Sequence, residues 1–226
     1  MNTPSHWLMT IVIAKIAERP GGLSGVLDNP PTESQLDRVT ENATEILADQ
    51  GSKKRKLPRW AMGLGSLAPD IPLYFLTFGG FFYFGRYLNW PAGKTAKHLF
   101  SNLFYNDPGW ITVHNFFHSP TMLLILGLST WFLRSKFPKF ARWSMFFLAA
   151  CALHSFVDIL THNDDGPLLF FPFNWTYRFS SPVSYWDTDH HGSAFMIFEG
   201  LLDLVLLAML VRFWWRDRSS KAIEVK

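Results

Sequence analysis

Long apolar blocks constrain this chain more than any other feature of its sequence. Of its 226 residues, 48% are hydrophobic, and they gather in blocks rather than in amphipathic stripes. A transmembrane helix needs roughly 17–25 predominantly apolar residues. Four blocks have that length: Trp60 to Phe84, Trp110 to Leu133, Arg142 to Leu160 and Ala194 to Trp215. A shorter segment, His6 to Ala17, precedes them. We therefore expect an all-α, integral-membrane bundle of four long helices plus a short N-terminal helix.

Lysine and arginine predict the orientation of these helices, because both residues concentrate in cytoplasmic loops. Basic residues cluster before the first long block, between the second and third, and after the fourth: Lys53, Lys54, Arg55, Lys56, Arg59; Arg134, Lys136, Lys139, Arg142; Arg212, Arg216, Arg218, Lys221 and Lys226. Residues 161–193 contain four acids and one base, Arg178. We expect a multi-pass protein of a bacterial-type plasma (inner) membrane, with its N terminus and the 161–193 loop outside and its C terminus in the cytoplasm.

Residues 20–58 form a polar insert between the short segment and the first long block. Thr32 followed by Gln35 has the spacing of a capping box, which marks the start of a helix. Apolar residues then recur at helical spacing up to Leu47. We predict a small cytoplasmic amphipathic helix here, packed against the rest of one membrane-embedded domain, residues 1–226.

The end of the third long block contains three residues that commonly bind metals. His154, Asp158 and His162 are four positions apart, so they share one face if the helix continues through Thr161. Imidazole and carboxylate groups are ordinary ligands of zinc and similar ions. The alternative is that the histidines pack in the core and bond to the backbone. Three ionisable groups on one face of a membrane helix are costly unless they are paired or liganded, which favours a metal site.

Similar groups recur near the same predicted depth in the other blocks. His114 and His118 are four apart in the second block, and Asp70 lies where Pro69 and Pro72 interrupt the first. The topology places these groups in the outer half of the bundle, independently of their chemistry. A further set could join the site or stay outside it: His190, His191, Glu199 and Asp203. Asp164 and Asp165, which precede Gly166 and Pro167, are typical of a turn.

The 161–193 loop is rich in aromatic residues, including Phe170, Phe173, Trp175 and Trp186. Tryptophan and tyrosine favour the membrane–water interface. One interpretation is an aromatic belt at that interface. The other is a lid that admits a lipid-like substrate from the side.

Several of these stretches together resemble the membrane-bound metal-dependent hydrolase family, which includes a LexA-regulated bacterial inner-membrane protein. More distantly, the helical His-x-x-x-Asp arrangement is similar to that of zinc-dependent phospholipase C. The matching stretches cover most of the chain outside 20–58: Thr3 to His6, Gly65 to Asp70, His114 to Ser119, His154 to Asp158, and Gly166 to Phe173. The resemblance implies a metal site with these members: His6, Asp70, His114, His118, His154 and Asp158. His6 is included on the resemblance alone, and the spacing of four between His114 and His118 departs from the family pattern.

Two functions from different classes follow from these observations. The first is a membrane-integral, metal-dependent hydrolase of a lipid-like phosphoester, with zinc as the favoured divalent ion and Asp70 as a ligand or catalytic base. The second is a non-catalytic metal-binding, structural or transport protein. We expect membrane lipids as partners and no nucleic acid, because the net charge of +3 is modest and the basic residues flank the apolar blocks. Neither the substrate nor the oligomeric state follows from the sequence.

Overall fold

The computed structural model describes residues 2–18 and 57–224, and the predicted helix of the polar insert lies outside these ranges. The described part is helical and contains no β-strand, only one isolated bridge between Leu168 and Arg178. This confirms the predicted all-α class. The α-helices are α1 (Thr3–Ala17), α5 (Arg59–Leu67), α6 (Ile71–Gly80), α7 (Ala92–His98), α8 (Phe104–Asn106), α9 (Pro108–Asn115), α10 (Pro120–Leu133), α11 (Pro138–Thr161) and α12 (Gly192–Glu224).

Within residues 2–18 and 57–224, two helices are long and apolar enough to cross a membrane by themselves: Pro138–Thr161 and Gly192–Arg216. The second apolar block forms a pair, α9 and α10, which is bent by 54° and counts as a third span if it is taken as one. The bend lies before Pro120, whose ring cannot donate the backbone hydrogen bond that a continuous helix requires. The structure thus supports a membrane protein with two or three such spans.

The first apolar block is also divided. It forms α5, then a break at residues 68–70, then α6 and a π-helix, Phe81–Tyr87. The prolines on both sides of Asp70 account for this break, as the sequence predicted. Residues 85–109, which separate the first and second apolar blocks, are largely helical and contain α7, a π-helix at Leu99–Leu103, and α8.

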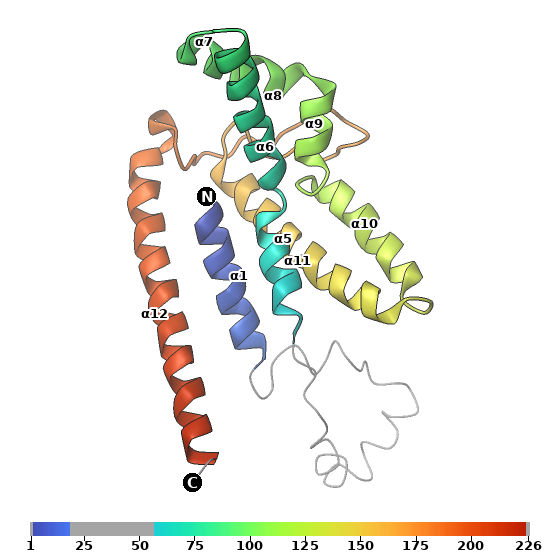
Figure 1. Ribbon diagram of the computed structural model, residues 1–226, viewed down its shortest axis with the longest axis vertical. Coiled ribbons are helices and arrows are strands. Elements are labelled where there is room, and N and C mark those ends of the chain that lie inside the picture. Colours follow the sequence, from blue (N-terminus) through green and yellow to red (C-terminus); the bar gives the residue numbers. More distant parts are fainter. Residues whose placement is uncertain (1, 19–56, 225–226) are drawn as a thin grey trace.

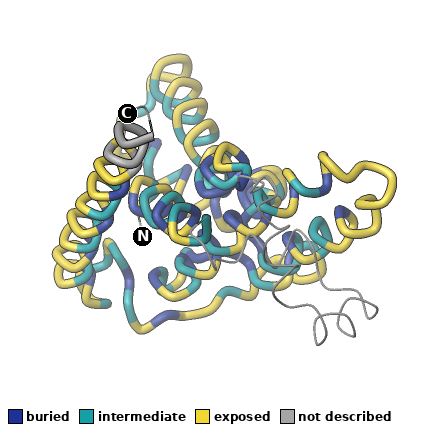
Figure 2. The backbone as a smooth tube through the Cα atoms, turned by 90° about the horizontal axis from the view of Figure 1, so that it is seen from below, coloured by how far each residue is buried: buried dark blue, intermediate teal, exposed yellow. Residues whose placement is uncertain are grey.

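Helices α1, α5 and α11 pack together at the centre of the bundle, with α12 against α1 and α10 against α11 (Figure 1). Most residues of α12 are exposed, as Figure 2 shows, including Ile197, Leu201 and Leu204. Such a large apolar surface suits contact with lipid chains. Buried residues gather instead where α1, α5 and α11 meet (Figure 2).

The close contact between α5 and α11 depends on small side chains. Ala61 is fully buried, and Gly65, one turn further along α5, faces the backbone of Phe147 on α11. A Cβ at Gly65 would lie 3.0 Å from the Cβ of Ala150 and would collide with the Phe147 carbonyl. Small residues four apart are a common means of bringing membrane helices close together. Here they bring the C-terminal end of α5 against α11.

We predict that Gly65→Ala destabilises the protein by about 1–3 kcal/mol, the usual cost of overpacking a tight contact. Gly79→Ala on α6 is the matched control, because nothing lies within 4 Å of a Cβ there. Alanine also favours a helix over glycine, so the control should be neutral or stabilising. Thermal unfolding in detergent, followed by circular dichroism, measures the difference. Equal losses in the two variants would show that the helix contact is not tight.

We also predict the orientation drawn from the basic residues. The test uses two matched substitutions at exposed serines, Ser180→Cys in the 161–193 loop and Ser135→Cys between α10 and α11. Both are made in a Cys151→Ser background, which removes the single natural cysteine. An impermeant thiol reagent should label position 180 in intact cells and position 135 only after lysis. The opposite pattern would reverse the topology.

Candidate functional site

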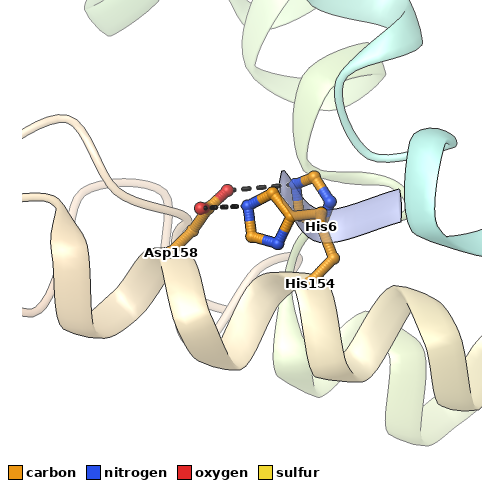
Figure 3. A group of neighbouring side chains, drawn as sticks. All are labelled: His6, His154 and Asp158. Carbon is orange, nitrogen blue, oxygen red and sulfur yellow. Dashed lines mark hydrogen bonds and ion pairs between the residues drawn. The ribbon is translucent and has the colours of Figure 1, made fainter. Parts of the chain in front are cut away.

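The carboxylate of Asp158, which is only 2% exposed, lies among three histidines from different parts of the chain. Its Oδ1 is 2.9 Å from Nε2 of His6 on α1. Its Oδ2 is 3.0 Å from Nε2 of His118, at the break between α9 and α10, and 3.0 Å from Nε2 of His154, one turn earlier on α11. Figure 3 shows His6 and His154 on the same side of this carboxylate, with their rings stacked 3.8 Å apart. The structure therefore brings together side chains that are up to 152 residues apart in sequence.

The orientation of His154 is fixed by the end of α5. Its Nδ1 donates a hydrogen bond to the backbone carbonyl of Ser66 at 2.7 Å, so this nitrogen must bear a proton. Its Nε2 makes ion-pair contacts with Oδ2 of Asp158 at 3.0 Å and Oδ1 of Asp70 at 3.4 Å, but none of the described residues forms a hydrogen bond with this nitrogen. A neutral imidazole would present a lone pair to two carboxylates, which is repulsive. The geometry thus demands a positive charge at this nitrogen, either a proton or a bound cation.

Asp70 reaches the cluster because the first apolar block is broken. It lies between the C terminus of α5 and the N terminus of α6. The hydroxyl of Thr3 donates to Oδ2 of Asp70 and also lies 2.9 Å from the hydroxyl of Tyr74. These contacts turn Oδ1 towards His154. Thr3 is a supporting residue whose role could not be assigned from sequence, although it begins the stretch that ends at His6.

These residues fit a divalent metal ion. Two groups have ligand atoms within 4.8 Å of one another: His6, His154 and Asp158, and Asp70, His118 and Asp158. Around tetrahedral zinc, ligand atoms lie ~3.4 Å apart, and the contacts to Asp158 and Asp70 quoted above, 2.9 to 3.4 Å, are close to that value. The carbonyl bonded to His154 Nδ1 is also the usual outer partner of a metal-binding histidine.

Two further predicted residues lie at the edge of the cluster. The ring of His114 is 4.9 Å from that of His118, but the bend after α9 keeps it outside both groups, and its Nδ1 has no hydrogen-bond partner. His162 directly follows α11, with Nε2 3.7 Å from Oδ1 of Asp158. Its Nδ1 is bonded to Asp165 at 2.9 Å. Both histidines adjoin the cluster without completing either group.

Asp165 has a larger role than the turn residue that the sequence suggested. It accepts hydrogen bonds from His162 and, at 2.9 Å, from the indole of Trp186. Burial works to raise the pKa of its carboxyl, but the hydrogen bond and charge of His162, together with the hydrogen bond from Trp186, outweigh burial and hold the pKa below its usual value. The spacing of three between His162 and Asp165 was the available sequence signal.

The residues left open by the sequence divide into two kinds. Glu199 is buried and accepts hydrogen bonds from the backbone and side-chain amides of Asn2, while Asp203 accepts from Ser5 at 2.9 Å. These contacts from α12 hold the first turn of α1, which supplies His6. His190 pairs with Asp187 at 2.7 Å, and His191 is exposed; neither belongs to the cluster.

The bend that positions His118 is tied to the aromatic loop. Asn115 donates to the carbonyl of Ile111 and accepts from the amide of Leu168, each at 2.9 Å. Ser119 donates to the carbonyl of Phe171 at 3.1 Å. Because these bonds satisfy polar groups where the helix is broken, the bend is part of the structure rather than a local irregularity. The loop therefore contacts the segment that carries His118.

A pocket of about 980 Å³ opens beside the cluster. Asp70, His118 and Asp158 lie on its surface, whereas His6 and His154 do not. Aromatic side chains form much of its wall: Tyr74, Phe100, Phe104, Tyr105, Tyr185 and Trp186. No lysine or arginine is among the described residues that line it, while five aspartates are. The predicted aromatic loop thus provides part of a pocket wall, through Tyr185 and Trp186.

Comparison with known proteins gives a family for the chain. No curated protein and no solved structure matches it. The model of one family, described as YdjM inner membrane protein, matches residues 1–223. The match includes all the residues of the His/Asp cluster as well as the apolar helices. The chain belongs to the YdjM inner membrane protein family.

Proposed function

We propose that this protein is a membrane-integral, metal-dependent hydrolase that acts on a lipid-like phosphoester. The observation that carries the proposal is the meeting of a potential metal site with a pocket: Asp70, His118 and Asp158 form one ligand group and also line the pocket. Pockets of about 300–1,000 Å³ are typical of small-molecule sites. A divalent ion held there, with zinc favoured by the imidazole and carboxylate ligands, supplies an activated water and polarises the scissile group.

The charges of the pocket make metal essential for an anionic substrate. The five aspartates of its lining would repel a phosphoester, and no described basic side chain of the lining offsets them. A divalent metal held by the ligand group would neutralise Asp70 and Asp158 and present a positive centre to the phosphoester. In the proposed reaction the oxygen of water forms a bond to phosphorus, and the bond from phosphorus to the ester oxygen breaks. A pocket carboxylate takes the proton of the water, and the leaving oxygen gains one.

The position of the pocket favours a lipid-like substrate. It lies at the end of α11 and α12 that adjoins the 161–193 loop, and aromatic side chains such as Phe100, Tyr105 and Trp186 line it. Aromatic residues are common at the membrane–water interface. A lipid headgroup could therefore reach Asp158 while its chains stay beside the helices.

A structural metal is the second candidate, and one observation favours it: His6 and His154 are 0% and 1% exposed, as in a closed site. Transport has less support. Towards the basic ends of the helices, the cluster is followed by a buried apolar group of Leu123, Leu148 and Cys151.

The test is turnover by purified protein in nanodiscs, offered phosphatidic acid, undecaprenyl diphosphate and common phospholipids, with and without chelator. We predict release of phosphate or headgroup that chelator abolishes. His118→Ala should lower the rate at least ~100-fold. Loss of a residue that merely hydrogen-bonds to a metal ligand already lowers metal affinity or activity about 10–100-fold, and His118 is proposed to be a ligand itself. His190→Ala is the matched control and should leave it unchanged, since that side chain pairs with Asp187 away from the cluster.

Asp70→Asn assigns the role of that carboxylate in the same assay. If Asp70 is a ligand, as its group with His118 and Asp158 favours, metal and turnover should fall together. If it is the base, the metal should stay and turnover should be lost. A folded, metal-loaded wild-type protein that is inert on this panel and on ester and peptide substrates would contradict the hydrolase and leave the structural role.

A further inference from the structure

We propose that the cluster binds two divalent ions, bridged by the carboxylate of Asp158. One ion is held by His6, His154 and Asp158, and the other by Asp70, His118 and Asp158. The inference rests on the metal site of the proposed function but not on hydrolysis. It adds a second ion and a division of labour between the two.

The first argument is geometric. Atoms bound to a single ion at about 2.0–2.4 Å are at most about 4.8 Å apart. The ligand atoms of the cluster fall into two groups that meet this limit, and Asp158 is the shared member. His6 and His118, one from each group, contact different oxygens of Asp158: Oδ1 lies 2.9 Å from His6, and Oδ2 lies 3.0 Å from His118. His154 also lies 3.0 Å from Oδ2, so its ring stands between the two groups. A carboxylate with a ligand partner on each oxygen is suited to bridging two ions.

The second argument concerns charge. The pocket beside the cluster is lined by five aspartates, including Asp70 and Asp158, and by no lysine or arginine among its described residues. Asp164 and Asp165 interact with Arg178 behind this wall, so the ions would act chiefly on Asp70 and Asp158. One divalent ion would balance these two carboxylates. A second would leave the cluster positively charged, and the ions would also supply the positive charge that Nε2 of His154 requires. Clustered carboxylates in a partly buried site are costly unless cations balance them.

The two ions would differ in their access to solvent. His6 and His154 are buried and do not line the pocket, whereas Asp70 and His118 do. Closed sites are typical of structural ions, and sites with an open position are typical of catalytic ones. The inner ion would therefore join α1 to α11, while the outer ion would face the pocket and exchange more readily.

The number of bound ions can be measured on the wild-type protein. Protein in nanodiscs is loaded with zinc and desalted, and elemental mass spectrometry should then find about two zinc ions per chain. X-ray absorption at the zinc edge should show metal–metal scattering at about 3.5–4 Å, the separation usual in two-metal sites. Chelation should remove the ions in two phases, with the outer one faster. One ion per chain, without metal–metal scattering, overturns the inference.

Variants identify which ligands hold which ion. His118→Ala should retain about one ion, which chelator removes only slowly, and His6→Ala should retain about one that leaves quickly. His190→Ala, the matched control, should retain two. Complete loss from both single-site variants, with the fold intact, would indicate one shared ion and contradict the proposal. If the protein binds two ions but shows no turnover, this inference stands and the proposed hydrolase is refuted. If it shows turnover with one ion, the hydrolase stands and this inference is refuted.

Discussion

The buried carboxylate of Asp158 joins three separate segments of the bundle. An unpaired carboxylate inside a membrane protein costs several kcal/mol. Asp158 is compensated by His6 from α1, His118 from the bend between α9 and α10, and His154 from its own helix. His6 and His118 can reach it only if their segments approach α11 at that level. The need to satisfy one charge therefore relates the positions of three segments.

The helix breaks follow from the same need. A straight first block would carry its backbone past the cluster, whereas the break at residues 68–70 places Asp70 beside His154. The close approach permitted by Gly65 brings the Ser66 carbonyl to Nδ1 of that histidine. Irregular backbone at membrane depth is tolerated where it is buried in protein or lines a cavity. Both breaks, before α6 and before α10, adjoin the pocket.

The sequence predicted the helical class and much of the cluster because apolar length and ligand spacing are local properties. His154 and Asp158 are one turn apart on one helix, and Pro69 and Pro72 indicated the break around Asp70. The bend after α9 was not predicted. Pro120 was a local signal for a break, but the shape of the bend also depends on bonds between Asn115 or Ser119 and a loop about 50 residues away. The pairing of Asp165 with His162 was missed because Asp-Gly-Pro sequences are typical of turns. His6 was included through family resemblance, since its contact with Asp158 spans 152 residues.

We infer that the His/Asp cluster is a metal site that holds the bundle together. The dependence of the protein's stability on metal is the direct test of this inference. Wild-type protein in detergent would be stripped with chelator and then titrated with zinc while its thermal unfolding is followed. Binding to the folded state alone adds about 4 kcal/mol at a thousandfold excess over Kd. We predict a lower unfolding temperature after stripping and its recovery with zinc, with no recovery in His154→Ala. An unfolding temperature that neither chelator nor zinc changes would contradict the account and identify the cluster as a hydrogen-bonded network of protonated histidines and carboxylates.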